Sequence, residues 1–263
     1  MSVILAVTLS AFVLLCGNLK ATASSTKIII GHAAVNSRVV PLWIAQELGF
    51  FAKNGLDAEV VFIRTGPILI SALTAGRINI GYAAGEALVL GDQTILLQAL
   101  DTGTIDVATL DKVFTSILKQ KGFSILLDLS HANIPMIGMS ALAQKSSIEK
   151  RPEIVENFLK AMLEGLAFSL SPENKTAVIR TIMKRLKITD PSAAELAYLD
   201  IVNIMDRKPF PSLDGLRNVH RLYSSRDPRV ANVKPEDVID NRILNKLDKV
   251  GFIDEIYRNY GVK

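Results

Sequence analysis

The sequence predicts an α/β protein built on a parallel sheet, because short β-branched segments alternate with amphipathic helical segments. Strands are expected over residues 27–33, 56–64 and 78–85, with helices over 41–48 and 68–76 between them. This order and spacing are typical of consecutive βαβ units. A chain of 263 residues, of which 49% are hydrophobic, is long and apolar enough to bury a core of this kind.

The C-terminal half is predicted to consist of helices in series. Apolar positions within 152–170 recur three and four residues apart, which places them on one face of a helix. Ser171 and Asp190 are each followed by a proline, a combination typical of a capping residue and the first helical position. Residues 251–257 are expected to lie in the last helix.

One sequence pattern occurs twice at a short separation. Residues 68–80 read ILISALTAGRINI and residues 95–107 read ILLQALDTGTIDV, so both fit I-L-x-x-A-L-x-x-G-x-I-[ND]-[IV]. Each copy predicts a helix that ends at a glycine and is followed by a short strand. After the second copy we expect a further helix over 110–122 and a strand over 123–130.

Residues 1–23 are predicted to be a secretory signal peptide. The nearly unbroken apolar run over 3–15 is too short to span a bilayer as a helix, and A-x-A at 21–23 fits a cleavage site. No Lys or Arg precedes the run, so a buried N-terminal helix stays open as the alternative. Leucine precedes Cys16 where a lipoprotein signal takes a small residue, so no lipid anchor is expected there. Cleavage would leave a mature chain without cysteine.

Charge and motifs argue against several functional classes. The formal net charge is +4, or +3 without the one lysine of the signal peptide, and no concentrated basic patch predicts a nucleic-acid partner. No G-x-S-x-G, P-loop or H-E-x-x-H motif occurs, so no catalytic residue is predicted. Carboxylates such as Glu195 and Asp200 are interpreted as solvated helix faces. The dispersed His32, His131 and His220 predict no metal site, and no cofactor is expected.

Four segments, in the same order along the chain, resemble the nitrate/sulfonate/taurine family of substrate-binding proteins of ABC importers. They are VPLWIAQELGFFAKNGLDAEVVF, ALTAGRINIGYA, RPEIVENFLKAMLEG and GFIDEIY, and the resemblance runs from about Lys27 to Tyr257. It implies a periplasmic-binding-protein-like fold, in which two α/β lobes joined by crossover strands close over a small ligand. It also implies a periplasmic, monomeric protein that delivers a small anionic or polar solute to a membrane permease and performs no chemistry.

The resemblance divides the chain into a first lobe over 27–93, a partial second lobe over 94–132, and a return crossover with C-terminal helices over 133–263. These helices are expected to pack mainly on the first lobe. The two copies of the repeated pattern are too close for complete lobes, since a lobe with its crossover takes on the order of 100 residues. We therefore expect an internal deletion near 89–90, of about 70 residues. Apolar faces and strand edges that the missing part would cover should be exposed.

Ligands of open parallel sheets bind at the carboxyl ends of the strands, in the loops that lead into helices. Those loops are 33–38, 64–67 and 83–86. Backbone N–H groups at the helix starts favour an anion or a polar head group, and Arg64 could pair bidentately with a sulfonate, carboxylate or nitrate. The residues predicted to contact the ligand are Ala34, Asn36, Ser37, Arg64, Thr65, Gly66 and Gly85.

Simpler roles stay open for some of these residues. Arg64 could be an exposed strand end, and Asn36 and Ser37 could do no more than cap the following helix. Trp43 is predicted to belong to the core and not to a ligand-stacking platform.

Two other functions also remain open. An enzyme on the same fold would resemble the thiamine-pyrimidine synthases, but these need a Cys-rich metal motif that a mature chain without cysteine lacks. The other alternative is a non-functional, truncated paralogue. A misassigned reading frame would also account for the short spacing of the two copies.

Overall fold

The computed structural model describes residues 25–84, 93–108, 110, 112–128, 134–225 and 228–262. Several predictions concern residues outside these ranges: the signal peptide, Cys16, the contact residue Gly85, and the deletion near 89–90.

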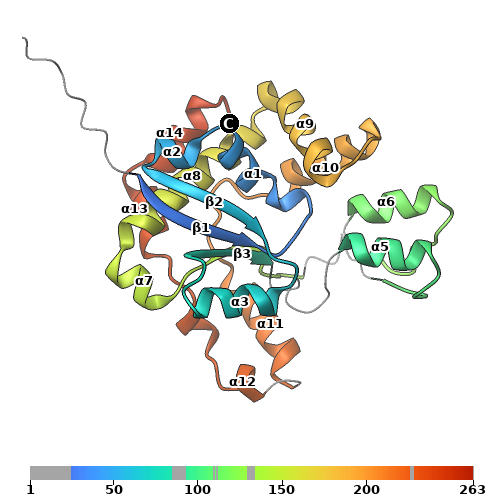
Figure 1. Ribbon diagram of the computed structural model, residues 1–263, viewed down its shortest axis with the longest axis horizontal. Helices are drawn as coiled ribbons and strands as arrows, with labels where there is room; N and C mark the ends of the chain where they lie inside the picture. The colour runs from blue at the N-terminus through green and yellow to red at the C-terminus, as the bar shows by residue number, and fades with distance from the viewer. Residues whose placement is uncertain are drawn as a thin grey trace, which may run out of the picture.

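A four-stranded mixed sheet forms the centre of the described chain, with strand order β2-β1-β3-β4 (Figure 1). The strands β1 (Thr26–His32), β2 (Leu56–Phe62) and β3 (Ile80–Ala84) run parallel, and β4 (Met139–Leu142) is antiparallel to β3. All three strands predicted in this region are therefore confirmed. β3 is buried along its whole length, as expected of a central strand covered on both faces.

The helices between these strands are also close to the predicted ranges. The 3₁₀ helix η1 (Ser37–Val39) leads into α1 (Val40–Glu47) and α2 (Phe50–Lys53), and α3 (Gly66–Thr74) follows β2. Prolines occupy the first turns of α1 and α3, where a missing N–H costs no helical hydrogen bond. Gly49, between α1 and α2, adopts the left-handed conformation with φ 71°.

The two copies of the repeated pattern form the same helix end. In the first copy α3 ends before Gly76 (φ 68°), and in the second α5 (Gln93–Asp101) ends before Gly103 (φ 67°). The N–H that follows each glycine donates back to an alanine carbonyl five residues earlier: Arg77 to Ala72 at 2.9 Å, and Thr104 to Ala99 at 2.8 Å. The predicted glycine ends are therefore confirmed in both copies.

The strands predicted after the second copy are wrong for the described residues. Residues 105–108 and 123–128 belong to no strand, although α6 (Lys112–Gln120) forms between them as predicted. The first copy continues into β3, which pairs with β1 and β4, whereas an isolated strand has no ladder to join. Side chains that a sheet would bury are consequently exposed: Val107 is 65% exposed, Leu126 77% and Leu127 74%.

The remaining elements are almost all helical, as predicted. In order they are α7 (Lys145–Lys150), α8 (Pro152–Leu170), η2 (Pro172–Asn174), α9 (Lys175–Leu186), α10 (Pro191–Ile204), α11 (Leu213–Ser224), α12 (Pro228–Ala231), η3 (Pro235–Val238), α13 (Arg242–Lys249) and α14 (Phe252–Asn259). None of the described helices is long and apolar enough to cross a membrane.

Helix α8 packs against α1 and α2, with α13 and α14 also in contact with it. The rings of Phe51 and Phe158 stack with centroids 6.0 Å apart, and Tyr257 of α14 is fully buried. Gly165 permits the close approach of α8, since a Cβ there would lie 2.3 Å from the carbonyl oxygen of Pro41. In Figure 1, α5 and α6 lie to one side of this body of sheet and helices.

The predicted polar residues in the helical half have different outcomes. Ser171 is the N-cap residue of η2 and precedes Pro172 as predicted, but its side chain makes no capping hydrogen bond. Asp190 accepts a hydrogen bond from the N–H of Ser192 at 2.9 Å, as expected. Glu195 is partly exposed and accepts from Lys175 at 2.5 Å. Asp200, in contrast, is buried and does not belong to a solvated face, because α10 packs that side against η1.

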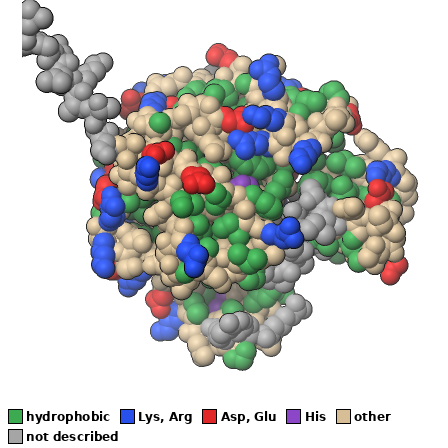
Figure 2. Space-filling view, viewed as in Figure 1, with side chains coloured by type: hydrophobic (Ala, Val, Ile, Leu, Met, Phe, Trp, Pro, Cys, Tyr) green, Lys and Arg blue, Asp and Glu red, His purple; other side chains and the backbone are tan. Residues whose placement is uncertain are grey.

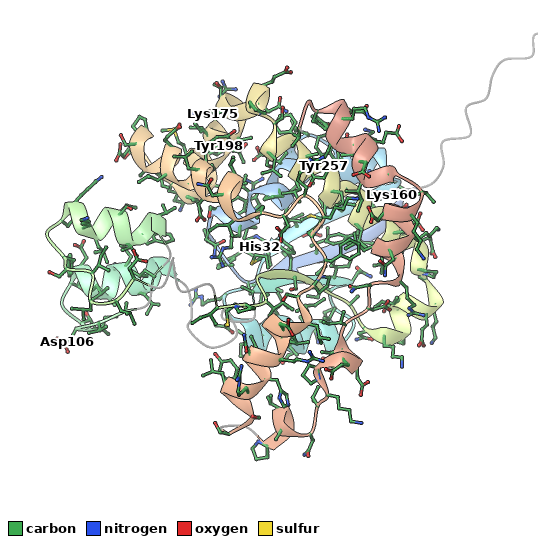
Figure 3. All side chains as sticks on the ribbon, turned by 180° about the vertical axis from the view of Figure 1, so that it is seen from behind. His32, Asp106, Lys160, Lys175, Tyr198 and Tyr257 are labelled. Atoms are coloured by element: carbon green, nitrogen blue, oxygen red, sulfur yellow. The ribbon has the colours of Figure 1, made fainter. Side chains whose placement is uncertain are left out.

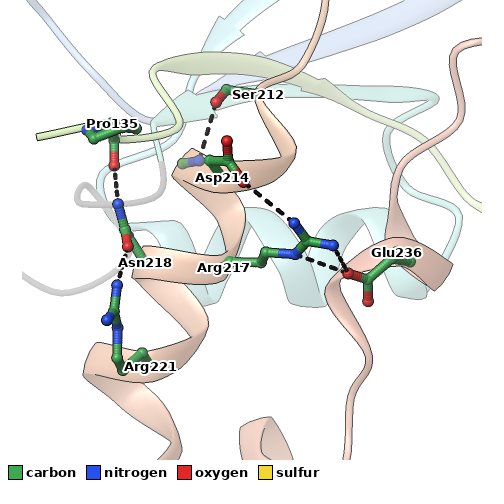
Figure 4. Close-up of polar contacts among 8 residues, drawn as sticks. Pro135, Ser212, Asp214, Arg217, Asn218, Arg221 and Glu236 are labelled. Carbon is green, nitrogen blue, oxygen red and sulfur yellow. Dashed lines mark hydrogen bonds and ion pairs between the residues drawn. The ribbon is translucent and has the colours of Figure 1, made fainter.

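Helix α11 is tied to the segment that precedes β4 (Figure 4). Asn218 donates from Nδ2 to the carbonyl oxygen of Pro135 at 2.7 Å, and Ser212 caps the helix by accepting from the N–H of Gly215 at 3.0 Å. Arg217 donates through Nε and Nη2 to Glu236, at 2.9 and 2.7 Å. The bond to Pro135 joins the segment before β4 to the C-terminal helices, and the other bonds lie within the C-terminal part of the chain.

Candidate functional site

The carboxyl ends of β1, β2 and β3 meet at one edge of the sheet, as their parallel pairing requires. Backbone hydrogen bonds continue past the strand ends: Ile63 donates to the carbonyl of His32 at 2.9 Å, and Ala33 to that of Tyr82 at 3.3 Å. The loops after β1 and β2 therefore begin side by side. This is the edge where the sequence predicts ligand contacts.

The loop after β1 uses its polar side chains within the fold. Asn36 is buried, and its Oδ1 accepts a hydrogen bond from the N–H of Arg38 at 3.1 Å, which is the capping role that the sequence left open. Ser37 is also buried and donates from Oγ to Oδ2 of Asp200 at 2.6 Å. Ala34 is partly buried, and its carbonyl accepts from His32. Ligand contact by these residues stays a prediction.

The loop after β2 is more open. Arg64 is exposed, which fits either of its two predicted roles. Thr65 is the N-cap of α3, and its Oγ1 accepts from the N–H of Ile68 at 3.5 Å. Gly66, the first residue of α3, is buried. Arg64 thus lies two residues before the start of a nine-residue helix, and both the arginine and the helix start favour negative charge at this point.

His32 was not among the predicted contacts, although it ends β1 at this edge. Its ring lies between Trp43 and Phe62, with centroids 5.9 and 5.5 Å away, near the middle of the molecule in Figure 3. Nδ1 lies 2.8 Å from the carbonyl oxygen of Ala34 and therefore donates the proton. Burial lowers the pKa of His32 and the charge of Arg185 adds to this effect, against the opposing bond to Ala34. The ring is consequently neutral near pH 7.

Trp43 is buried, so its predicted place in the core is confirmed. The guanidinium of Arg185 in α9 lies 5.9 Å from the centre of its ring. A similar contact occurs further along, where Lys175 lies 5.4 Å from the ring of Tyr198, beside it in Figure 3. Trp43 therefore belongs to the core and does not offer an exposed ring to a ligand.

Two hollows lie at the other end of the strands. One of about 300 Å³ is lined by residues that include Asn79, Ser147 and Arg151, and one of about 210 Å³ by residues that include Gln46 and Asp57. Neither contains a predicted contact residue. The edge with the predicted contacts also carries exposed apolar side chains, Phe62 and Ile68. Figure 2 shows further hydrophobic side chains on the face that carries the strands.

Comparison with known sequences gives a short match. No model of a known protein family matches the chain. Proteins named as binding proteins from Brucella abortus and Brucella suis are 32% identical over 93 residues, which is 35% of this chain. The matched stretch spans 26% of the length of these relatives.

Comparison with solved structures covers far more of the chain. A protein from Bordetella bronchiseptica aligns with a TM-score of 0.69 at 13% identity, over 86% of this chain and 98% of that one. The periplasmic aliphatic sulphonate binding protein SsuA of Escherichia coli aligns at 0.61 and 13%, over 84% and 99%. The periplasmic nitrate-binding protein NrtA of Synechocystis aligns at 0.51 and 13%, over 86% and 89%. The chain therefore has the α/β fold of periplasmic binding proteins, as the sequence predicted.

Proposed function

We propose that this chain is the periplasmic solute-binding component of an ABC importer and that it performs no chemistry. The observation that carries the proposal is that the carboxyl ends of three parallel strands meet at one edge of the sheet, in a chain with the fold of periplasmic binding proteins. The proposed ligand contacts at this edge come from the loops at 34–37 and 64–66, in agreement with the general rule for open parallel sheets.

The proposed ligand is a small anionic or polar metabolite of the nitrate, sulfonate or taurine type. Exposed Arg64 and the capped start of α3 supply positive potential at one point of the edge. SsuA and NrtA, whose names state sulphonate and nitrate binding, support the class of ligand by their likeness in fold.

The proposed partner is a membrane permease, with which a monomer of this chain would dock after secretion. The apolar run over 3–15 and the A-x-A motif at 21–23 support export to the periplasm. An intact mass of the secreted protein that matches a chain beginning at Ser24 would support this part of the proposal. A retained Met1, or a lipid on Cys16, would contradict it.

We also propose that an internal segment of about 70 residues is missing near 89–90, so that the lobe over 94–132 is incomplete. The support is that α5 ends as α3 does, whereas 105–108 and 123–128 have no strand to pair with and expose Val107, Leu126 and Leu127. Groups from a complete second lobe would close over the ligand. Losing several hydrogen bonds to a charged ligand, each about 1.5–3 kcal/mol, predicts binding weakened by powers of ten.

The same exposed apolar side chains favour a second candidate, a truncated paralogue that no longer binds. A thermal-shift titration with nitrate, methanesulfonate, taurine, bicarbonate and a pyrimidine separates the two. A ligand at 100 times its dissociation constant adds about 2.7 kcal/mol to the free energy of unfolding. A shift that begins at millimolar ligand supports a weakened binding protein, and no shift up to 100 mM supports the paralogue. A shift at micromolar ligand contradicts the proposed loss of contacts.

Arg64→Ala tests the site itself, with Arg77→Ala as the matched control, since both arginines are exposed and flank α3. Arg64→Ala is expected to weaken binding of the best anion at least tenfold, whereas Arg77→Ala leaves it within twofold. Equal affinities for the wild type and Arg64→Ala would show that Arg64 has no part in the site.

A further inference from the structure

Ser37 and Asp200 form a buried hydrogen bond between the loop after β1 and helix α10. The Oγ–Oδ2 distance is 2.6 Å, and the two residues are 1% and 6% exposed. A carboxylate buried to this extent is stable only with a hydrogen-bond donor. Removing either partner leaves the other polar group unsatisfied, which costs more than the net gain of the bond.

Helix α10 contacts η1 on the one hand and α6 on the other. The contact with η1 is partly apolar, because Ala197 and Ile201 share a buried cluster with Val39, and Val113 of α6 belongs to that same cluster. Asp200 therefore makes its polar bond within a packed helix interface. Because α10 packs against both η1 and α6, the position of Asp200 is fixed by the packing of its helix.

Apolar packing of Val35 and Val39 in the core also supports the segment around Ser37, and so does a hydrogen bond from a side chain outside it. Asn36 caps within the loop, and the hydroxyl of Tyr82 donates to the carbonyl oxygen of Arg38 at 3.3 Å, a long bond. The bond from Ser37 to Asp200 is shorter and charge-assisted. It is therefore stronger than the bond from Tyr82 to the carbonyl of Arg38.

We infer that Asp200 is a positioning residue for the loop over 34–38, which it holds through the Ser37 hydroxyl. Because that hydroxyl proton is directed at Asp200, Ser37 shapes the loop and does not donate to a ligand. The inference deepens the proposed function and rests on it only in taking this loop to face the ligand. The hydrogen bond between Ser37 and Asp200 can be tested without a ligand.

Hydrogen exchange of the full chain without ligand tests the inference. In Asp200→Ala and Ser37→Ala the amides of 36–40 are expected to exchange at least tenfold faster, while those of β2 stay within twofold. Asp200→Asn should restore much of the protection, since its amide oxygen accepts the same hydroxyl. Glu195→Gln is the matched control on α10, because Glu195 bonds to Lys175 outside the core, and it should leave 36–40 within twofold.

Unchanged exchange at 36–40 in Asp200→Ala and Ser37→Ala would overturn the inference. Equally faster amide exchange in β2 and in the loop would also overturn it, because that result would indicate a loss of global stability and no local effect on the loop. If Asp200→Ala does not fold, Ser37→Ala and Asp200→Asn decide the matter by the same comparison. Nitrate, methanesulfonate, taurine, bicarbonate and a pyrimidine are then titrated into each folded variant. Failure of the wild type to bind any of them up to 100 mM overturns the proposed function, but leaves the exchange result intact.

Discussion

Arg185 of α9 donates from Nε to Oε1 of Glu47 in α1 at 2.8 Å, which joins the helical half of the chain to the first helix after the sheet. Glu47 also accepts from Thr181 at 3.1 Å and from Lys184 at 3.2 Å. One carboxylate thus gathers three donors from a single helix. Partial burial raises the pKa of Glu47, but the bonds from these donors outweigh it and hold the pKa below its usual range.

Glu47→Gln is therefore expected to remove a pH-dependent part of the stability. A depressed folded pKa contributes stability that is present above the ordinary value of 4.5 and is lost as pH falls through the lower folded value. At pH 7 the loss should be roughly 0.5–1 kcal/mol, because the ion pairs are partly exposed. Urea titrations at pH 7 and pH 3 measure it, and an equal loss at both pH values would contradict the assignment.

His32 predicts a pH dependence of the same sign in a different range. Its folded pKa is lowered, so below about pH 6.5 the unfolded chain binds a proton that the folded chain refuses. The free energy of unfolding should therefore fall as pH drops below this value. His32→Asn keeps a donor for the carbonyl of Ala34 but does not titrate, so its stability should fall less between pH 7 and pH 5. Parallel curves for the two proteins would refute the prediction.

The glycines of the fold allow a matched test of packing. Gly165→Ala should destabilise by about 1–3 kcal/mol, because its Cβ would meet the backbone of Pro41 and force α8 away from α1. Gly138→Ala is the control, since nothing lies within 4 Å of its added Cβ and its φ is not positive. Thermal unfolding of both variants measures the difference. Similar melting temperatures for the two variants would show that α1 and α8 can move apart at little cost in stability.

The exposed leucines after α6 predict a surface property. Replacing Leu126 and Leu127 by serine should lower the binding of a hydrophobic dye, with the melting temperature changed by less than about 2 °C, since little buried area is lost. Leu118→Ser is the contrast, because Leu118 is buried on α6 and its replacement should destabilise the chain. Unchanged dye binding in the double variant would show that these leucines are covered in solution.

Local sequence patterns predicted the three parallel strands and the helices between them, but not the antiparallel strand β4. Pro41 lies in the first turn of α1, where a proline is favoured, and β-branched runs mark β1 and β2. The repeated pattern also predicted two equal helix ends, at Gly76 and Gly103, because left-handed backbone after a helix depends on the glycine itself.

The fold class also followed from the sequence, through the order of strands and helices and through the resemblance to a known family. For the candidate ligand edge, the sequence placed Arg64 and Thr65 in the loop after β2, but it did not predict that Thr65 caps α3. These features depend on residues close together along the chain or on the general geometry of parallel sheets.

Tertiary structure decided what depends on partners far away in the chain. The same pattern becomes a strand at 80–84, where β1 and β4 offer hydrogen bonds, and none at 105–108, where the described chain offers no neighbour. Asp200 has the helical spacing of a surface carboxylate, yet α10 turns it toward Ser37. Strand pairing and burial are properties of the assembled chain, because they are paid for by contacts between segments that local sequence does not bring together.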